Sequence, residues 1–369
     1  MNFSLGGITD AINKLTGSLG GGGDSDSVIG LDIGTSTIKM VQLKQKKGAA
    51  VLETYGEIAL GPYASAEVGQ SVNAPQEKVI EALTDLLRES NASSRTGGVA
   101  VPLSGSLISV ISLPTKNRDD LASMVPIEAR KYIPVPVTEV ALDWFVIPEE
   151  EARFISGNAE EKKNVTDVLL VAIHNQLIER DQAILAGAGV TAKFFEVEPF
   201  SMGRASYEHG TAPVMVIDFG ASSTRVYIVE FGIISVSHTI PRGGQDITLS
   251  WSKSKSMTFA EAEAEKRSHG IENNEVGKSV IEYVLSEARR IFLSYQRKEN
   301  KAVSKVVLLG GGALLKGLPE LSKQYFDAPI TLGAPFDRVS APAFISEVLK
   351  FAGPSFASAI GLALRALQR

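Results

Sequence analysis

The sequence predicts an α/β protein made by duplicating one unit, a strand meander followed by a helix, with a smaller α/β module inserted between the copies. Three observations predict this fold class. One strand–turn–strand pattern occurs twice, far apart in the chain. Apolar residues at helical spacing follow each copy. A long intervening stretch has strand and helix patterns of its own. A duplicated unit has a natural cleft between its halves, and we expect ligand binding there.

The repeated pattern is an apolar strand, a sharp Asp-x-Gly turn and a polar second strand. The two copies are VIGLDIGTSTIK (28–39) and VMVIDFGASSTR (214–225). Asp32 and Lys39 of the first copy correspond to Asp218 and Arg225 of the second. Each hairpin tip presents backbone amides, hydroxyls and a carboxylate, because glycine allows the backbone to turn sharply. Two such tips facing each other would clamp a polyphosphate and its magnesium.

The composition limits what surrounds this pair. A chain of 369 residues suggests two or more compact units. Its 44% hydrophobic and 21% charged residues are ordinary for a globular protein, and a net charge of -5 gives no general attraction to nucleic acid. The absence of cysteine excludes disulfides, thiolate zinc sites and thiol catalysis, and four scattered histidines argue against a histidine-built metal site. No apolar run approaches the roughly 18 residues of a membrane span, so we expect a cytoplasmic protein.

The N-terminal segment differs from the rest of the chain. Ile8, Ile12, Leu15 and Leu19 recur at helical spacing, and a run of four glycines follows. One interpretation is a weak amphipathic helix, on a flexible tether, that contacts a membrane or a partner. A mostly disordered tail is the interpretation that we favour, because the segment carries little positive charge and several glycines.

The first unit continues as a meander, with Ile38–Leu43 turning at Lys44–Gly48 into Ala49–Leu60. A helix is expected over Gln76–Ser90, where apolar residues fall on one face. The stretch between Gly98 and Phe195 reads as strands, helix, strand and helix. Its predicted elements are Val99–Pro114, Asp119–Tyr132, Val168–His174 and Gln176–Ala188. Asp119 and Asp120 are expected to cap the helix that they begin. Acidic runs from Glu149 and Glu160 are expected in a mobile loop of this module.

The second unit repeats the scheme, with strands at Val214–Phe219, Ser223–Val229 and Ile233–Thr239. A buried strand from Lys305 then ends in three glycines, followed by a helical pattern over Leu314–Tyr325. Backbone without side chains can lie flat against a base or a phosphate, so the glycines belong with the two tips.

Glu263 and Lys266 share one face of a predicted helix that begins at Phe259. The carboxylate of Glu263 is placed to accept hydrogen bonds from ribose hydroxyls, and the ammonium of Lys266 to lie near phosphates. The alternative is a solvated charged helix with no ligand.

These motifs resemble those of the actin-like ATPase superfamily, which has a duplicated, ribonuclease H-like fold. Asp32-x-Gly-Thr-Ser resembles its first phosphate motif, and Asp218-x-Gly-Ala-Ser-Ser-Thr its second. Gly310-Gly-Gly-Ala resembles its adenosine motif. Glu198-Pro-Phe-Ser and Ser358-Ala-Ile-Gly resemble its two connecting helices. In bacterial relatives the Glu of Glu-Pro orients the attacking water, which implies this role for Glu198. Packing at a helix N-terminus is the alternative role for this side chain.

Within the superfamily the chain most resembles the PilM family of type IV pilus assembly, and next the FtsA family of cell division. The residues that carry this resemblance include Ala129–Pro136, Asp143-Trp, and Ala262-Glu263 with Lys266. The resemblance covers residues 28 to 369 and places the insert where these families carry a relocated subdomain. The domains it implies are a tail (1–27), a first half (28–97 with 196–212 and 354–369), an inserted α/β subdomain (98–195), a second half (213–245 with 300–353) and a helical adenosine-side subdomain (246–299).

The resemblance implies ATP and Mg²⁺ as cofactors, with Asp32 and Asp218 holding the metal through water and, with Glu198, serving catalysis. The residues implied to bind the nucleotide are Gly34, Thr35, Ser36, Lys39, Gly220, Ala221, Ser222, Ser223, Gly243, Glu263, Lys266, Gly310, Gly311, Gly312 and Ala313. Ala221 departs from actin, which places a carboxylate next to this glycine. We therefore expect nucleotide binding with slow hydrolysis at most.

The implied function is an ATP-binding scaffold at the cytoplasmic face of the inner membrane. Its implied partner is a PilN-like membrane protein, whose N-terminal cytoplasmic peptide docks on the inserted module. Other pilus platform or motor proteins and self-association are further possibilities, and no nucleic acid is expected. The alternatives are a sugar kinase of the same superfamily and an FtsA-like cell-division protein. A kinase needs its own catalytic carboxylate near the γ-phosphate, and no sequence near the cleft motifs nominates one.

Overall fold

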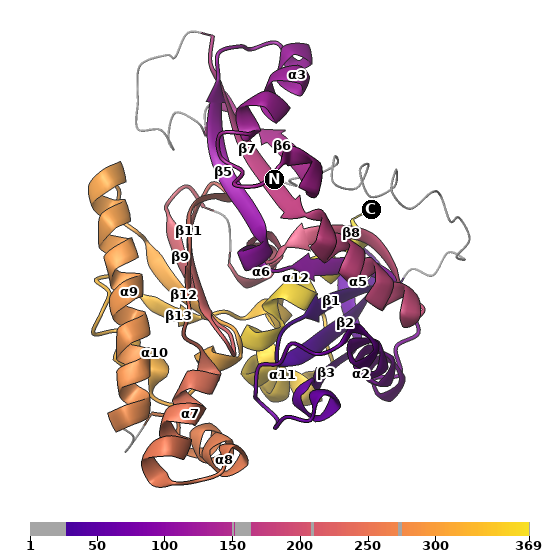
Figure 1. Cartoon of the computed structure of the whole chain (residues 1–369), viewed down its shortest axis with the longest axis vertical. Coiled ribbons are helices and arrows are strands. Elements are labelled where there is room, and N and C mark those ends of the chain that lie inside the picture. Colours follow the sequence, from indigo (N-terminus) through magenta and orange to yellow (C-terminus); the bar gives the residue numbers. More distant parts are fainter. Residues whose placement is uncertain (1–26, 150, 152–163, 208–209, 272–274, 369) are drawn as a thin grey trace.

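The computed structural model describes residues 27–149, 151, 164–207, 210–271 and 275–368 (Figure 1). The predicted N-terminal helix and the run from Glu160 lie outside these residues. The described part consists of two five-stranded sheets, a separate three-stranded sheet and the helices that cover them.

The first sheet has the strand order β3-β2-β1-β4-β8. Its strands are β1 (Ser27–Ile33), β2 (Thr37–Lys46), β3 (Ala49–Ala59), β4 (Thr96–Val101) and β8 (Thr191–Val197). The first three form the predicted antiparallel meander, and β4 and β8 add to it in parallel. Helix α2 (Gln76–Glu89), predicted within one residue, packs its apolar face on Ile29, Leu31 and Met40. Helix α12 (Ala357–Leu367) covers the opposite face.

The second sheet has the order β11-β10-β9-β12-β13. Its strands are β9 (Val214–Phe219), β10 (Thr224–Glu230), β11 (Ile233–Ile240), β12 (Lys305–Leu309) and β13 (Ile330–Leu332). The pairing repeats that of the first sheet, with two antiparallel contacts and then two parallel ones. The same topology in both sheets confirms the predicted duplication.

Helices on the second sheet carry the motif that is predicted to lie on the adenosine side. They are α7 (Gly244–Lys255), α8 (Phe259–His269) and the long α9 (Glu275–Glu299), whose apolar face packs on the sheet. The helix predicted over Leu314–Tyr325 is instead a 3₁₀ turn, η4 (Gly311–Leu314), and a short α10 (Leu318–Ser322). Gly317 interrupts them in the left-handed region, with φ of 85°.

The inserted module has its own sheet, in the order β5-β7-β6, with α3 (Arg118–Ala129) packed on one face. Its strands are β5 (Ser106–Leu113), β6 (Val140–Val146) and β7 (Thr166–His174). The expected limits of the insert, residues 98 and 195, fall within β4 and β8, which belong to the first sheet. Helix α5 (Asn175–Gly187) likewise packs with α2. The separate sheet therefore covers less sequence than expected, because the residues of β4 and β8 indicate strands without indicating which sheet they join.

The N-terminus of α3 also differs from the prediction. The side chain of Asn117 accepts a hydrogen bond from the backbone N–H of Asp119, so Asn117 is the cap. Asp119 and Asp120 lie in the first turn, where carboxylates favour the positive end of the helix dipole.

Two glycines bring the central elements of the first half into close contact. A Cβ on Gly30 of β1 would lie 1.9 Å from the carbonyl oxygen of Ala359 in α12. A Cβ on Gly361 would lie 1.8 Å from the carbonyl oxygen of Ser201, in α6 (Glu198–Ser206). Helix α12 is therefore held between the sheet and α6. The remaining short elements are η1 (Gly61–Ala64), η2 (Leu103–Gly105), η3 (Val137–Glu139), η5 (Pro335–Arg338), η6 (Ala343–Ile345), α11 (Ser346–Ala352) and η7 (Gly353–Phe356).

Within the described ranges, no helix is both long and apolar enough to cross a membrane.

Candidate functional site

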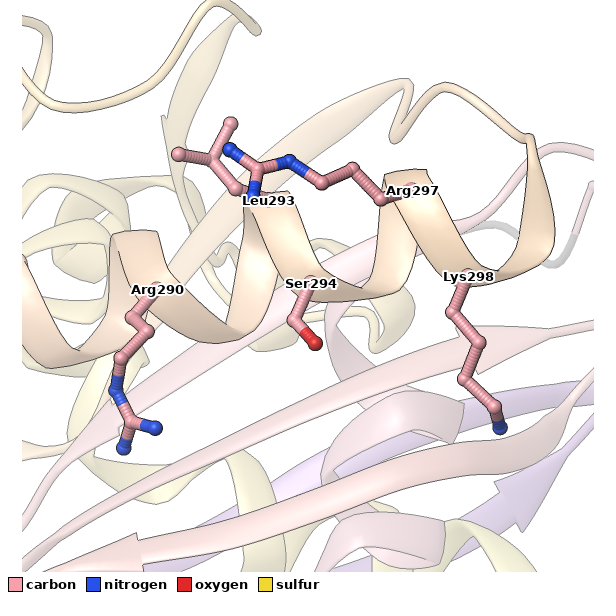
Figure 2. Close-up of a pocket in the computed structure, with 5 residues that line it drawn as sticks. All are labelled: Arg290, Leu293, Ser294, Arg297 and Lys298. Carbon is pink, nitrogen blue, oxygen red and sulfur yellow. The ribbon is translucent and has the colours of Figure 1, made fainter.

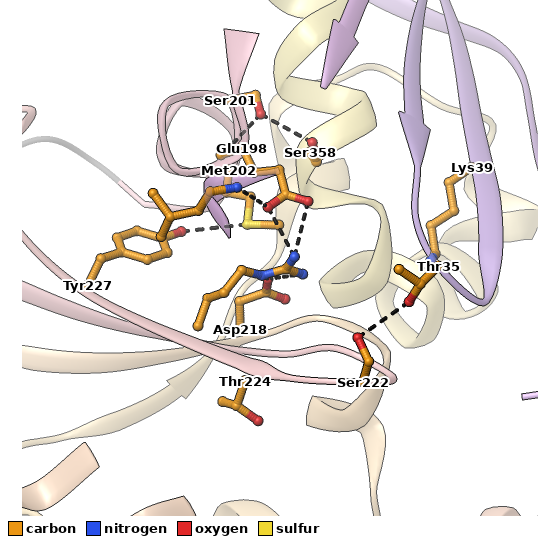
Figure 3. Close-up of polar contacts among 12 residues, drawn as sticks. Thr35, Lys39, Glu198, Ser201, Met202, Asp218, Ser222, Thr224, Tyr227 and Ser358 are labelled. Carbon is orange, nitrogen blue, oxygen red and sulfur yellow. Dashed lines mark hydrogen bonds and ion pairs between the residues drawn. The ribbon is translucent and has the colours of Figure 1, made fainter. Parts of the chain in front are cut away.

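The tips of the two hairpins meet in the structure. In each tip the glycine N–H donates to the carbonyl three residues on, from Gly34 to Thr37 (3.0 Å) and from Gly220 to Ser223 (3.1 Å). The hydroxyls of Thr35 and Ser222 share a hydrogen bond of 3.4 Å across the gap (Figure 3). The sequence motifs of the two halves are thus brought together at one point, with the tip residues exposed or half-buried.

Each aspartate lies opposite a basic residue in its hairpin, Asp32 opposite Lys39 and Asp218 opposite Arg225. The two basic side chains behave differently. Lys39 donates to the hydroxyl of Thr37 at 2.8 Å. Arg225 donates from Nε to Oδ2 of Asp218 at 2.7 Å, and its Nη2 forms an ion pair with the same oxygen at 2.7 Å. The protein therefore already neutralises the carboxylate of Asp218, whereas no basic side chain of the described residues holds that of Asp32 in this way.

Arg225 has a second carboxylate partner, Glu198, at the start of α6. Its Nη1 lies 3.2 Å from Oε1 and 3.0 Å from Oε2 of Glu198. The backbone N–H of Leu103 donates to the same carboxylate at 3.3 Å. Glu198 thus joins the second hairpin to Leu103, the first residue of η2, whose backbone N–H it satisfies. Arg225 was not among the predicted site residues, although its spacing from Asp218 equals that of Lys39 from Asp32.

The cluster is short of positive charge, and its pKa values reflect this. Burial raises the pKa of Glu198 to about 7; Arg225 lowers it, while Asp32 and Asp218 raise it. Burial also raises the pKa of Asp32, with Lys39 and Arg225 acting in the opposite direction. For Arg225, burial by itself lowers the pKa, but the neighbouring carboxylates raise it overall. A further cation beside Asp32 and Asp218 would relieve this imbalance.

Backbone from α7 lies directly beside the second tip. The N–H of Gly244 donates to the carbonyl of Gly220 at 2.9 Å, and that of Gln245 to the carbonyl of Ala221 at 3.0 Å. A Cβ on Gly243 would lie 2.4 Å from the oxygen of Ala221, so this position requires glycine. Gly243 is thus placed against the second phosphate motif.

An enclosed cavity continues from this contact. It is lined by Phe219, Thr224, Gly243, Gly244, Ile247, Val280, Ile281, Val284 and Gly312. Its volume is about 10 Å³, roughly the space of one water molecule. Its walls are mostly apolar side chains and glycine backbone, and Thr224 adds a hydroxyl. A purine would enter only if these walls moved apart.

The glycine triplet lies against the end of β9. Gly310 has a φ of 82°, and a Cβ there would lie 2.4 Å from Oδ1 of Asp218. A Cβ on Gly312 would contact Phe219 at 2.7 Å, whereas nothing lies within 4 Å of that position on Gly311. Ala313 is buried in the core of the second half. Only Gly311 of these four thus has open space next to its backbone.

Glu263 and Lys266 are bound to each other and to α7. Their Oε2 and Nζ atoms are 2.6 Å apart, and Lys266 donates to the carbonyl of Gly244 at 3.0 Å. Thr248 and Arg267 also donate to Glu263. Burial raises the pKa of Glu263, but Lys266 and the hydrogen bonds outweigh it and lower the pKa overall. The pair is therefore buried support for the N-terminus of α7, unlike the solvated helix of the alternative interpretation.

A loop of the first half crosses to these helices. The N–H of Ser71 donates to the side-chain oxygen of Gln245 at 3.0 Å, and that of Val72 to the carbonyl of Thr35 at 2.9 Å. A Cβ on Gly69 would lie 2.7 Å from the carboxylate of Glu263. The cleft is thus closed by direct contacts on the adenosine side as well as at the tips.

The residues present fit a magnesium polyphosphate better than a metal ion held by protein alone. Hydroxyls and glycine amides of two tips converge, and Asp32 is a carboxylate with a raised pKa at their base. Within the described residues, no group of three or more His, Cys, Asp or Glu side chains is placed to hold a metal. A magnesium ion would need phosphate oxygens and water among its ligands, as it does in most nucleotide sites.

A second hollow lies on α9, on the side of the second sheet away from the first half (Figure 1). Arg290, Leu293, Ser294, Arg297 and Lys298 line it. Figure 2 shows these side chains spread over two sides of the helix rather than converging on one point. Arg290 is already paired with Glu287. This hollow has none of the features of the cleft.

Comparison with known proteins agrees with this geometry. The family model described as type IV pilus assembly protein PilM matches residues 30–367. The solved structure of a PilM–PilN type IV pilus biogenesis complex is similar with a TM-score of 0.78 and 25% identity, covering 93% of this chain and 99% of that one. Cell division protein FtsA of Borreliella burgdorferi is 24% identical, covering 91% of this chain and 90% of that protein. The ethanolamine utilization protein EutJ of Carboxydothermus hydrogenoformans shares the fold, with a TM-score of 0.54 and 16% identity over 94% of this chain and 92% of that one. The predicted actin-like α/β fold is confirmed.

Proposed function

The chain belongs to the PilM family of type IV pilus assembly proteins, and on that basis we propose that it is a nucleotide-binding scaffold which docks a PilN-like membrane protein. The observation that carries the proposal is the family match over residues 30–367, joined to the similarity with a structure of PilM in complex with PilN. We place the protein at the cytoplasmic face of the inner membrane, where such a partner presents its N-terminal peptide.

The nucleotide is ATP with Mg²⁺, bound in the cleft between the two hairpin tips. Thr35 and Ser36 of the first tip and Ser222 and Ser223 of the second would bind the phosphates. Asp32 and Asp218 would hold the metal through water, and the metal would neutralise phosphate charge. Gly243 and Gly312 border the small cavity that would have to widen to take the base. Binding requires the Thr35–Ser222 contact and the Ser71–Gln245 contact to open.

Hydrolysis is slow at most. A water-orienting carboxylate must be free to accept a proton or a hydrogen bond from water. Glu198 instead faces Arg225 and the N–H of Leu103, and is buried. The protein is thus better suited to hold a nucleotide and adopt a conformation than to turn the nucleotide over.

The partner peptide docks on the inserted module near the end of α3. Ile127 and Tyr132 expose 64% and 42% of their surface here, and Arg130 between them is also exposed. Exposed aromatic, arginine and large apolar side chains in one place are typical of the centre of a protein interface. This segment also contains the Ala129–Pro136 motif through which the sequence resembles PilM.

Calorimetric titration with a synthetic peptide tests this function. The peptide is the N-terminal cytoplasmic segment of a PilN-like protein from the same organism. We expect micromolar or tighter binding and, for Tyr132→Ala, a loss of affinity of about tenfold or more. Tyr283→Ala is the matched control, because Tyr283 is similarly exposed (49%) but lies on α9. Absence of binding by the unmodified protein, with and without ATP, would refute the scaffold function; equal loss in both variants would refute the docking position.

A further inference from the structure

A continuous chain of polar contacts leads from the second hairpin tip to the start of the inserted module. It runs from Asp218 through Arg225 and Glu198 to the backbone N–H of Leu103. Leu103 begins η2, the turn directly before β5. We propose that this chain, the Arg225 relay, couples the nucleotide cleft to the partner-binding face of the insert, with Arg225 as its positioning residue. The proposal rests on the function proposed above and adds its regulation.

The relay is shielded from solvent along its length. The side chains of Asp218, Glu198 and Arg225 expose 2%, 6% and 19% of their surface. Charge-assisted hydrogen bonds are strengthened in such surroundings, and a change at one member alters the others. Asp218 and Glu198 lie at the centre of the polar network in Figure 3.

Coupling between sites requires an element that can change its arrangement, and we assign this part to Arg225. Arg225 is shared between two carboxylates, and it lies closer to Asp218 (2.7 Å) than to Glu198 (3.0 Å). Asp218 belongs to the tip where the charges of a magnesium nucleotide would arrive. A new charge beside Asp218 changes how strongly that carboxylate competes for Arg225. The position of Glu198, and hence its bond to Leu103, changes with it.

Packing gives the insert a path to respond as a unit. On the face of its sheet opposite α3, Ile147 and Leu169 pack against Ile233 of β11, with Phe200 of α6 beside them. The insert thus packs against the second sheet and against α6, the helix that carries Glu198. Because packed interiors are close to incompressible, a shift of this helix displaces the module rather than being absorbed locally.

A pair of substitutions at Leu103 isolates the relay. Leu103→Pro removes the backbone donor, and Leu103→Ala keeps it; both shorten the side chain. Proline is tolerated sterically at this position, because it is the first residue of a 3₁₀ turn and Pro102 before it is extended, with φ of -64° and ψ of 139°. The comparison of the two variants therefore reports the hydrogen bond to Glu198 alone.

The experiment measures the peptide's dissociation constant by calorimetry with and without magnesium ATP. We expect ATP to tighten peptide binding about tenfold in the unmodified protein and in Leu103→Ala, and less than twofold in Leu103→Pro. By reciprocity, the peptide must tighten ATP binding by the same factor. Leu103→Pro counts as folded if its circular dichroism spectrum matches that of Leu103→Ala and its ATP affinity lies within about threefold. Glu198→Gln, which keeps the backbone intact, provides a second test and is expected to lose the coupling.

The outcomes separate the two proposals. If the unmodified protein binds no peptide under any condition, the scaffold function fails and the relay with it. If both ligands bind but ATP changes peptide affinity by less than twofold, only the relay is refuted. Equal coupling in Leu103→Pro, Leu103→Ala and Glu198→Gln would also refute the relay, because the coupling would then use another route.

Discussion

Replacement of Arg225 by glutamine tests the electrostatic account of the site. Glutamine is shorter and carries no charge, so Asp218 and Glu198 lose the cation that they share. All three side chains are largely buried. The substitution leaves two carboxylates close to Asp32 with no positive partner but Lys39 nearby.

The expected cost follows from the burial and from the pKa of Glu198. Removing one partner of a buried ion pair destabilises a protein by about 3–5 kcal/mol, because the remaining charge is left unpaired. Glu198 has a pKa of about 7, so it can bind a proton and avoid most of the cost of an unpaired buried charge. The loss therefore falls mainly on Asp218, and we expect about 3 kcal/mol at pH 7. The deficit must grow as the pH rises through 7, because Glu198 then loses its proton and needs the guanidinium.

Urea unfolding at pH 5, 7 and 8 measures this deficit. The fluorescence of Trp251 follows the second half, since its indole is buried in α7. Arg225→Lys is the control; it keeps the charge and loses one of the paired donors, so it should recover at least half of the stability. A deficit for Arg225→Gln below about 1 kcal/mol at pH 8, or one that is the same at pH 5, would refute the reasoning.

Two further predictions concern packing and burial away from the cleft. Gly361→Ala places a methyl group 1.8 Å from the carbonyl oxygen of Ser201 and should lower the free energy of unfolding by about 3 kcal/mol or more. Gly311→Ala, where the space is open, should leave stability unchanged. Equal melting temperatures for the two variants would contradict the packing described. Burial raises the pKa of Asp181 from 3.8 to about 6. Its contribution favours folding below about pH 4 and is lost as pH rises through 6, so Asp181→Asn should gain up to about 3 kcal/mol at pH 7 and nothing at pH 4. A gain that does not depend on pH would show that Asp181 is not the titrating group.

Much of the scaffold could be predicted from the sequence, because its signals are local. The Asp-x-Gly tips, the meander after each and the apolar face of α2 depend on residues within one element, and the structure has them in place. The limits of the insert were harder to predict. The apolar residues of β4 and β8 predict strands, but sequence alone does not tell which sheet each strand joins.

The contacts of the site depend on tertiary neighbours. Lys39 and Arg225 occupy equivalent positions in the two hairpins, yet Lys39 bonds to Thr37 and Arg225 reaches Asp218 and Glu198. The hairpin register could have placed Arg225 opposite Asp218 in advance. Its bond to Glu198 could not be foreseen, because that bond depends on how α6 packs against the second sheet. The donation by Leu103 depends on the same packing.

Titration of ATP into the unmodified protein and into Asp32→Ala, in the presence of magnesium, tests the cleft most directly. Asp32 lies at the base of the first tip, on the strand that faces Lys39. The account predicts a measurable affinity for the unmodified protein and a loss of at least about a hundredfold for Asp32→Ala, with an unchanged circular dichroism spectrum. Undiminished ATP binding by Asp32→Ala would contradict the placement of the nucleotide between the two hairpin tips.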